Sequence, residues 1–128
     1  MTAIESRADI ERLVEKFYTK VRKDSLLGEI FNHHIATDDW PAHLSKLSDF
    51  WEGHLLRGTN FRGNPVQKHI QVDQQLKHTM SMEHFDRWLQ LWSETIDSLY
   101  QGELAEKARL AAQRMAQAQL SIVQHNRL

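Results

Sequence analysis

The sequence predicts an all-α fold, and three features carry this prediction. Apolar residues recur at three- and four-residue steps along most of the chain, which is the spacing of one face of an α-helix. Only five glycines and two prolines interrupt the 128 residues, so the turns that a sheet-rich fold needs are scarce. No segment alternates apolar and polar residues over the length of a strand. Because there is no internal repeat, we expect one domain over residues 1–128.

The clearest helix is predicted over residues 38–57, DDWPAHLSKLSDFWEGHLLR. We expect Asp39 to cap this helix by accepting hydrogen bonds from the free N–H groups of its first turn. Pro41 lies in that same turn, where a missing N–H costs nothing. The start of the helix is therefore well defined by the sequence.

One stripe of this helix carries two histidines among large apolar residues, namely His43, Leu47, Phe50 and His54. A helix that only filled a core would place Leu or Ile at position 43, since a buried imidazole must find a hydrogen-bond partner. A polar donor at the edge of an apolar wall favours a pocket for a flat, apolar group that carries one polar atom.

The segments before this helix are predicted from capping and periodicity. Ser6 begins a helix over 6–23, and Asp9 completes its capping box. Residues 25–31 are expected to form a single helical turn, because they are too few for a full helix and include a glycine. Residues 32–37 then form the connection.

The segments after the central helix alternate loop and helix. Residues 58–65 are predicted to be a loop, followed by a two-turn helix over 66–72 around His69. The two remaining long helices are predicted over 81–102 and 103–124, and alanines on the last one allow a close approach to its neighbour.

The composition excludes several classes of function. A net charge of −1 provides no electrostatic footprint for nucleic acid or an anionic membrane surface. There is no long apolar run and no signal-like start, so we expect a cytoplasmic protein. The absence of cysteine excludes disulfides, thiolate zinc sites, iron–sulfur clusters and covalently attached haem. A cofactor would have to be held non-covalently, or through histidine, carboxylate or tyrosine.

A carboxylate–histidine metal centre is the weaker alternative. The pairs His34–Asp38 and His69–Asp73 have four-residue spacing, but two such pairs are also expected from the composition alone. The chain has no nucleophile elbow and no phosphate-binding glycine loop. Taken singly, Tyr18, His69 and Trp88 are ordinary core-edge or surface residues. Their joint occurrence with His43, on separate helices around several phenylalanines, favours a site.

At this point the residues resemble a known family, the truncated haemoglobins, and most closely their third group. The resemblance covers about residues 13–122 and has three specific parts. These are FYTKVRKDSLLGEIF over 17–31, Trp40-x-x-His43 followed by Phe50-Trp51, and HFDRWLQLW over 84–92. The glycine-pair motifs of the other two groups are absent, which agrees with the third group.

The resemblance implies a globin-like, truncated two-over-two helical sandwich that binds haem b. It implies His69 as the proximal iron ligand, with His78 as the alternative, and Lys46 as a residue that reaches a propionate or else simply remains solvated. The distal polar residues would be Tyr18, His43 and Trp88. The haem-contacting wall would be formed by Phe17, Phe31, Leu47, Phe50, Phe85 and Trp88.

A penta-coordinate haem iron with a polar distal pocket would bind dioxygen, CO or NO. Two or three donors would hold dioxygen tightly, which favours scavenging, sensing or redox chemistry over bulk oxygen transport. An NO dioxygenase or peroxidase-like enzyme, served by a reductase, is the alternative. A haem-free helical interaction module is a further alternative from another class. We expect a monomer.

Overall fold

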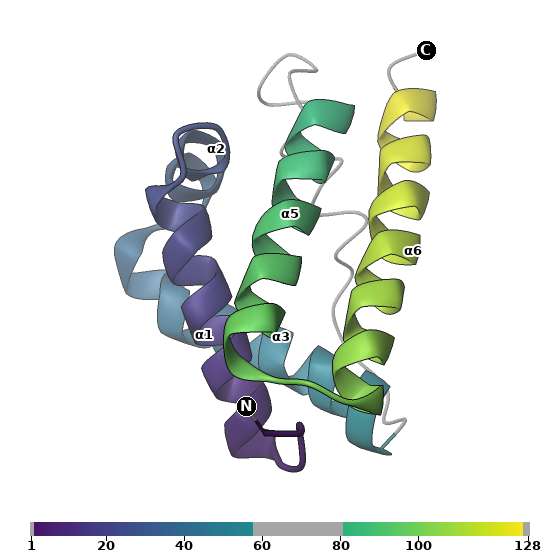
Figure 1. Ribbon diagram of the computed structural model, residues 1–128. Helices are drawn as coiled ribbons and strands as arrows, with labels where there is room; N and C mark the ends of the chain where they lie inside the picture. Colours follow the sequence, from purple (N-terminus) through teal and green to yellow (C-terminus); the bar gives the residue numbers. More distant parts are fainter. Residues whose placement is uncertain (1, 58–80, 127–128) are drawn as a thin grey trace.

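The computed structural model describes residues 2–57 and 81–126 of the chain, and this part is helical, as the sequence predicts (Figure 1). Its main helices, in chain order, are α1 (Arg7–Lys23), α2 (Leu27–His34), α3 (Trp40–Glu52), α5 (Met82–Leu99) and α6 (Glu103–Asn126). A short 3₁₀ helix, η1 (Thr37–Asp39), precedes α3, and a π-helical segment, η2 (Gly53–Arg57), follows it. None of the described helices is both long and apolar enough to cross a membrane.

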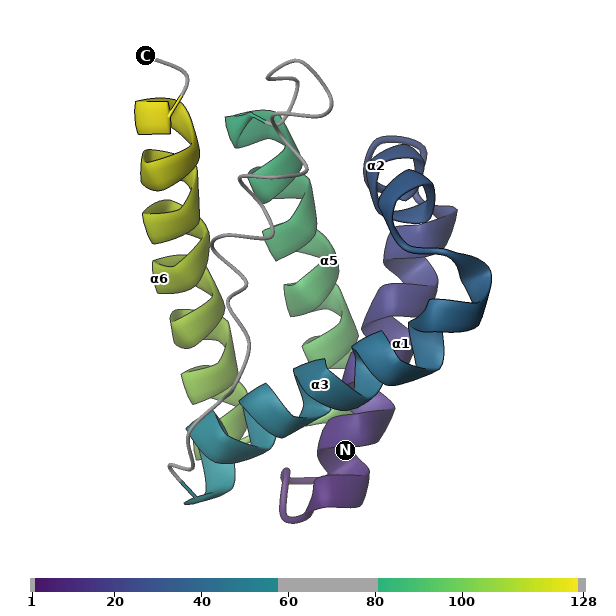
Figure 2. The same ribbon diagram turned by 180° about the vertical axis from the view of Figure 1, so that it is seen from behind.

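The helices form two layers. Helices α5 and α6 lie side by side and run in opposite directions, joined through a turn at Gly102 (Figures 1 and 2). Helix α1 packs against α2, α3 and α5, while α3 crosses the molecule so that η2 reaches α6. This arrangement is the predicted two-over-two sandwich.

The core lies between α1, α3, α5 and α6. The inward face of α1 and the facing side of α5 contribute fully buried side chains, among them Phe17, Trp92 and Ile96. The Trp92 indole N–H donates to the carbonyl of Ala108 at 3.1 Å, which satisfies a buried donor between α5 and α6. Because the neighbouring positions of α6 are alanines, the two helices approach closely.

The caps of α1 and α5 follow the prediction. The backbone N–H of Ser6 donates to the Asp9 carboxylate at 3.2 Å, and the N–H of Ser81 donates to Nδ1 of His84 at 3.0 Å. The predicted cap at Asp39 is wrong. Its backbone is already helical and its side chain caps nothing, because η1 leads directly into α3.

Helix α2 differs from the predicted single turn, since it is a helix of eight residues that also takes up His33 and His34. The Asp24 carboxylate accepts from the backbone N–H groups of Leu26 and Leu27, at 3.1 and 3.0 Å, and so provides the missing start signal. The predicted loop over 58–65, the helix over 66–72, and with them His69 and His78, lie outside the described residues.

Gly28 allows α2 to lie directly against α1. A Cβ atom at this position would lie 2.6 Å from the backbone carbonyl oxygen of Arg22, so the contact leaves no room for a side chain. The obstacle is backbone, which cannot rotate away as a side chain does. The glycine therefore fixes the distance between the two helices.

We predict that Gly28→Ala destabilises the protein by about 1–3 kcal/mol, measured by urea unfolding. Alanine favours a helix over glycine, but the overlap with the Arg22 carbonyl forces the two helices apart and outweighs that gain. Ser25→Ala, at an exposed position in the same corner, is the matched control and should stay within about 0.5 kcal/mol. A stability of Gly28→Ala equal to the wild type would contradict this account.

Candidate functional site

The candidate site begins with two consecutive aromatic residues of α1. Phe17 is completely buried and meets Trp88 and Trp92 of α5 edge to face, with ring centroids at 5.5 and 4.9 Å. The neighbouring Tyr18 is turned by about 100° around the helix, so it faces α2 and α3 instead. Its ring lies 6.2 Å from Phe31 of α2. Helix α1 therefore links a core of indoles to a second aromatic cluster.

That second cluster, the distal cluster, consists of Tyr18, Trp40 and His43. The Tyr18 ring lies 5.9 Å from Trp40 and 6.1 Å from His43, while Trp40 and His43 meet edge to face at 5.3 Å. Trp40 and His43 are three residues apart on α3, so one turn of that helix presents both rings to α1. The structure thus brings together two predicted distal residues, Tyr18 and His43.

Burial controls the chemistry of the Tyr18 hydroxyl. Desolvation raises the pKa of Tyr18 to about 12, because the phenolate would lose its hydration. Proximity to the Trp88 indole N–H opposes this shift, but the contact falls short of hydrogen-bond geometry. Tyr18 therefore remains a neutral O–H donor at every physiological pH.

Trp88, the third predicted distal residue, presents a donor without a partner. Its indole nitrogen is buried and has no hydrogen-bond partner within the described part of the chain. The ring is stacked on Trp92 with an interplanar angle of 4°, and Phe17 meets it from the side. Buried donors are normally paired, so an unpaired one beside the Tyr18 hydroxyl is a feature that a polar ligand atom would explain.

The predicted apolar wall divides into three groups. Phe31, Leu47 and Phe50 are half-buried, with part of their surface open beside the core. Phe85 is buried in a cluster with residues of α2 and α6 and packs with Phe31 and Trp88. Phe17 has no exposed surface at all, so it supports Tyr18 and Trp88 from behind. Lys46 is exposed on the outer side of α3.

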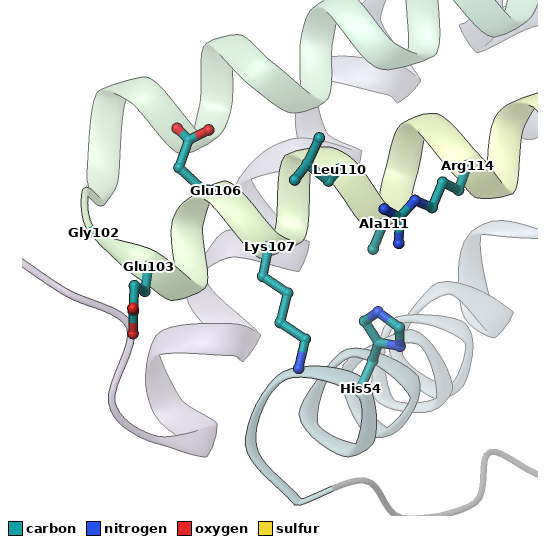
Figure 3. Close-up of a pocket in the computed structure, with 8 residues that line it drawn as sticks. All are labelled: His54, Gly102, Glu103, Glu106, Lys107, Leu110, Ala111 and Arg114. Carbon is teal, nitrogen blue, oxygen red and sulfur yellow. The ribbon is translucent and has the colours of Figure 1, made fainter.

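His54, the last residue of the predicted stripe that begins at His43, lies in a different environment from the distal cluster. His54 lies on η2, about 16 Å along the helix from His43, and its ring is stacked on Phe50 at 6.1 Å. There it lines a pocket of about 590 Å³ against α6 (Figure 3). Partial burial, together with the charge of Lys107, lowers the pKa of His54. Several charged side chains of α6 line this pocket, and none of the residues of the distal cluster does, so it is separate from that cluster.

The structure also gives a place in the site to Arg22, which sequence reasoning missed, and to Trp40, which the sequence singled out only as part of a family motif. The guanidinium carbon of Arg22 lies 4.7 Å above the ring of Trp40, so a cation covers the outer face of the distal cluster. Spacing contained a signal for both, because Arg22 follows Tyr18 by four residues and Trp40 precedes His43 by three.

The metal alternative finds no support among the described residues. No group of three or more histidines, aspartates or glutamates lies together in residues 2–57 and 81–126. Asp38, half of one proposed pair, is exposed on η1. The other pair, His69 and Asp73, is outside the described residues.

Three comparisons with known proteins agree on a family. Residues 2–121 match the bacterial-like globin family. A group 3 truncated hemoglobin from Campylobacter jejuni is 36% identical over 113 residues, which are 87% of this chain and 85% of that protein. The crystal structure of a group III truncated hemoglobin from the same species superposes with a TM-score of 0.84 at 32% identity, covering 96% of this chain and 95% of that one. The resemblance drawn from the sequence is confirmed.

We predict that Tyr18 does not ionise near pH 10 in the folded protein, as a spectrophotometric titration of tyrosinate absorbance will test. The unfolded chain deprotonates first as the pH rises above 10, while the fold keeps Tyr18 neutral up to about 12. Stability should therefore fall between these two values, and it should fall less steeply in Tyr18→Phe. A Tyr18 that titrates with a pKa of about 10 would mean that its hydroxyl is hydrated.

Proposed function

Because the chain belongs to the bacterial-like globin family, as a truncated haemoglobin of the third group, we propose that it binds haem b and holds dioxygen tightly in a polar distal pocket. Haem-based binding of small ligands is the general function of this family. The single observation that carries the finer proposal is the buried indole N–H of Trp88, which has no hydrogen-bond partner within the described residues and lies beside the buried hydroxyl of Tyr18.

The residues present fit such a group. The half-buried faces of Phe31, Leu47 and Phe50 offer an apolar surface next to the two donors. His69 would bind the iron, with His78 as the alternative ligand. Haem would supply an iron that binds diatomic ligands such as dioxygen, CO or NO. Lys46, exposed one turn beyond His43 on α3, has the length to reach a propionate.

The donors decide how strongly the pocket holds its ligand. Tyr18 O–H, Trp88 N–H and His43 would donate to a polarised diatomic ligand held in this pocket. Hydrogen bonds with this charge assistance are worth about 1.5–3 kcal/mol each. One of them slows release by about tenfold to a hundredfold. Tight binding suits ligand scavenging, sensing or redox chemistry better than bulk oxygen transport.

We predict that the chain takes up one haem that acid–acetone extraction removes completely, because there is no cysteine to tether it. The absorption spectrum of the reduced protein, with and without CO, measures this uptake. His69→Ala should abolish stable ligation, while His78→Ala should have a mild effect. The reverse order of severity would assign the iron ligand to His78, and no Soret band in the reconstituted wild type would leave only a haem-free role for the chain.

We predict that Tyr18→Phe raises the dioxygen off-rate about tenfold or more, in stopped-flow measurements, because one charge-assisted hydrogen bond is lost. The CO off-rate should change less, since CO carries less charge on its outer atom. A double-mutant cycle with Trp88→Phe should show coupling between the two donors.

Tyr100→Phe is the matched control, since it removes the hydroxyl of the other tyrosine, which donates to the carbonyl of Asp9 far from the distal cluster. It should leave both off-rates unchanged. Equal shifts for dioxygen and CO in Tyr18→Phe would indicate altered access to the pocket. Turnover of NO or peroxide at a useful rate would favour the enzymatic alternative.

A further inference from the structure

Arg22 is held at a fixed place on the outer side of the distal cluster. Its Nε donates to the side-chain oxygen of Asn32 at 3.3 Å, and the Asn32 amide donates back to the carbonyl of Arg22 at 2.9 Å. Gly28 brings α2 close enough for this reciprocal pair to form. Asn32 therefore holds the Arg22 side chain independently of its contact with an aromatic ring.

The ring that it contacts has no polar anchor of its own. Trp40 is only 2% exposed, and its indole N–H has no hydrogen-bond partner within the described residues. A buried indole is usually oriented by the hydrogen bond that its N–H makes, as Trp92 is by the carbonyl of Ala108. Trp40 must instead be oriented through its faces and edges. Arg22 lies over one face, with its guanidinium carbon 4.7 Å from the ring centroid.

The orientation of the Trp40 ring constrains the rings of His43 and Tyr18, which it contacts. Its ring meets His43 edge to face at 5.3 Å with an interplanar angle of 88°, and it lies 5.9 Å from Tyr18 at 46°. His43 and Tyr18 are themselves perpendicular at 85°. In such a closed triangle of rings, a rotation of Trp40 cannot occur without moving the other two.

We propose that Arg22 and Trp40 are positioning residues of the distal pocket, in which Arg22 fixes the plane of Trp40 and Trp40 fixes the orientation of His43 beside Tyr18. This inference rests on the proposed function for its effect on ligand binding, but the positioning itself does not require haem. Arg22 thereby restricts the orientations of the His43 and Tyr18 side chains without contacting the ligand itself.

The experiment compares Arg22→Met, which keeps an unbranched apolar side chain but removes the guanidinium and its charge, with Arg22→Lys, which keeps a cation at the same position. Arg12→Met is the matched control, since it removes an exposed arginine from the same helix. The full chain is studied as purified, in the CO-bound form if it carries haem. NMR reports the His43 ring signals and the solvent exchange of the Trp40 indole N–H, and the C–O stretching band reports the aim of the distal donors.

In Arg22→Met we expect the His43 signals to broaden or double, the Trp40 indole N–H to exchange faster, and the C–O band to split. The dioxygen off-rate should rise about two- to tenfold, as the loss of a cation–π contact predicts. Arg22→Lys should restore most of the wild-type behaviour, and Arg12→Met should match the wild type.

If Arg22→Met fails to fold, Asn32→Ala tests the same chain of contacts by removing only the partner that holds Arg22. It should change the His43 signals in the same direction but by less. Unchanged His43 and Trp40 signals in the charge-removing variants would overturn the inference. A protein that takes up no haem but shows the NMR changes would refute the proposed function and keep the positioning pair.

Discussion

The structure depends on the way in which α1 divides two consecutive aromatic residues between two environments. Phe17 enters a core of indoles on α5 and has no exposed surface, while Tyr18 is directed to Trp40 and His43 on α3. One helix turn therefore joins the main core to the candidate site. A change in the packing of Phe17 would reach the Tyr18 hydroxyl directly, so stability and ligand binding share the same contacts.

Two buried indole N–H groups at the candidate site lack a hydrogen-bond partner within the described residues, which costs stability. Leaving a buried indole N–H unpaired costs about 1–3 kcal/mol, and both Trp40 and Trp88 are in this state within the described residues. Their rings recover much of that cost through aromatic contacts, since Trp88 is stacked on Trp92 and flanked by Phe17. Within the described residues, the two indole donors without a partner therefore both lie in or beside the candidate site.

The sequence predicted the fold well, because helical periodicity and local caps determine where helices begin. The caps at Ser6 and Ser81 form as expected, whereas the cap at Asp39 fails because a 3₁₀ turn leads into α3. His43 was singled out by its place on a helical stripe, and Tyr18 and Trp88 by their joint occurrence with it, while their distal roles came from the family resemblance. Arg22 was missed because its contact with Trp40 joins two different helices, although its four-residue spacing from Tyr18 places both residues on one face of α1. The proximal assignment concerns residues beyond the described part.

An ion pair links the C-terminal end of α1 to α5, the helices that carry Tyr18 and Trp88. Asp24 directly follows α1, which carries Tyr18, and Arg87 directly precedes Trp88 on α5; Arg87 Nε donates to the Asp24 carboxylate at 2.7 Å. Burial alone would raise the pKa of Asp24, but the N–H groups of Leu27 and Leu26, together with the charge of Arg87, lower it, so the carboxylate stays ionised. Since its side chain is only 4% exposed, removing Arg87 would leave a buried charge with fewer partners. The pair therefore holds the end of α1 against α5, the two helices that carry the Tyr18 hydroxyl and the Trp88 indole.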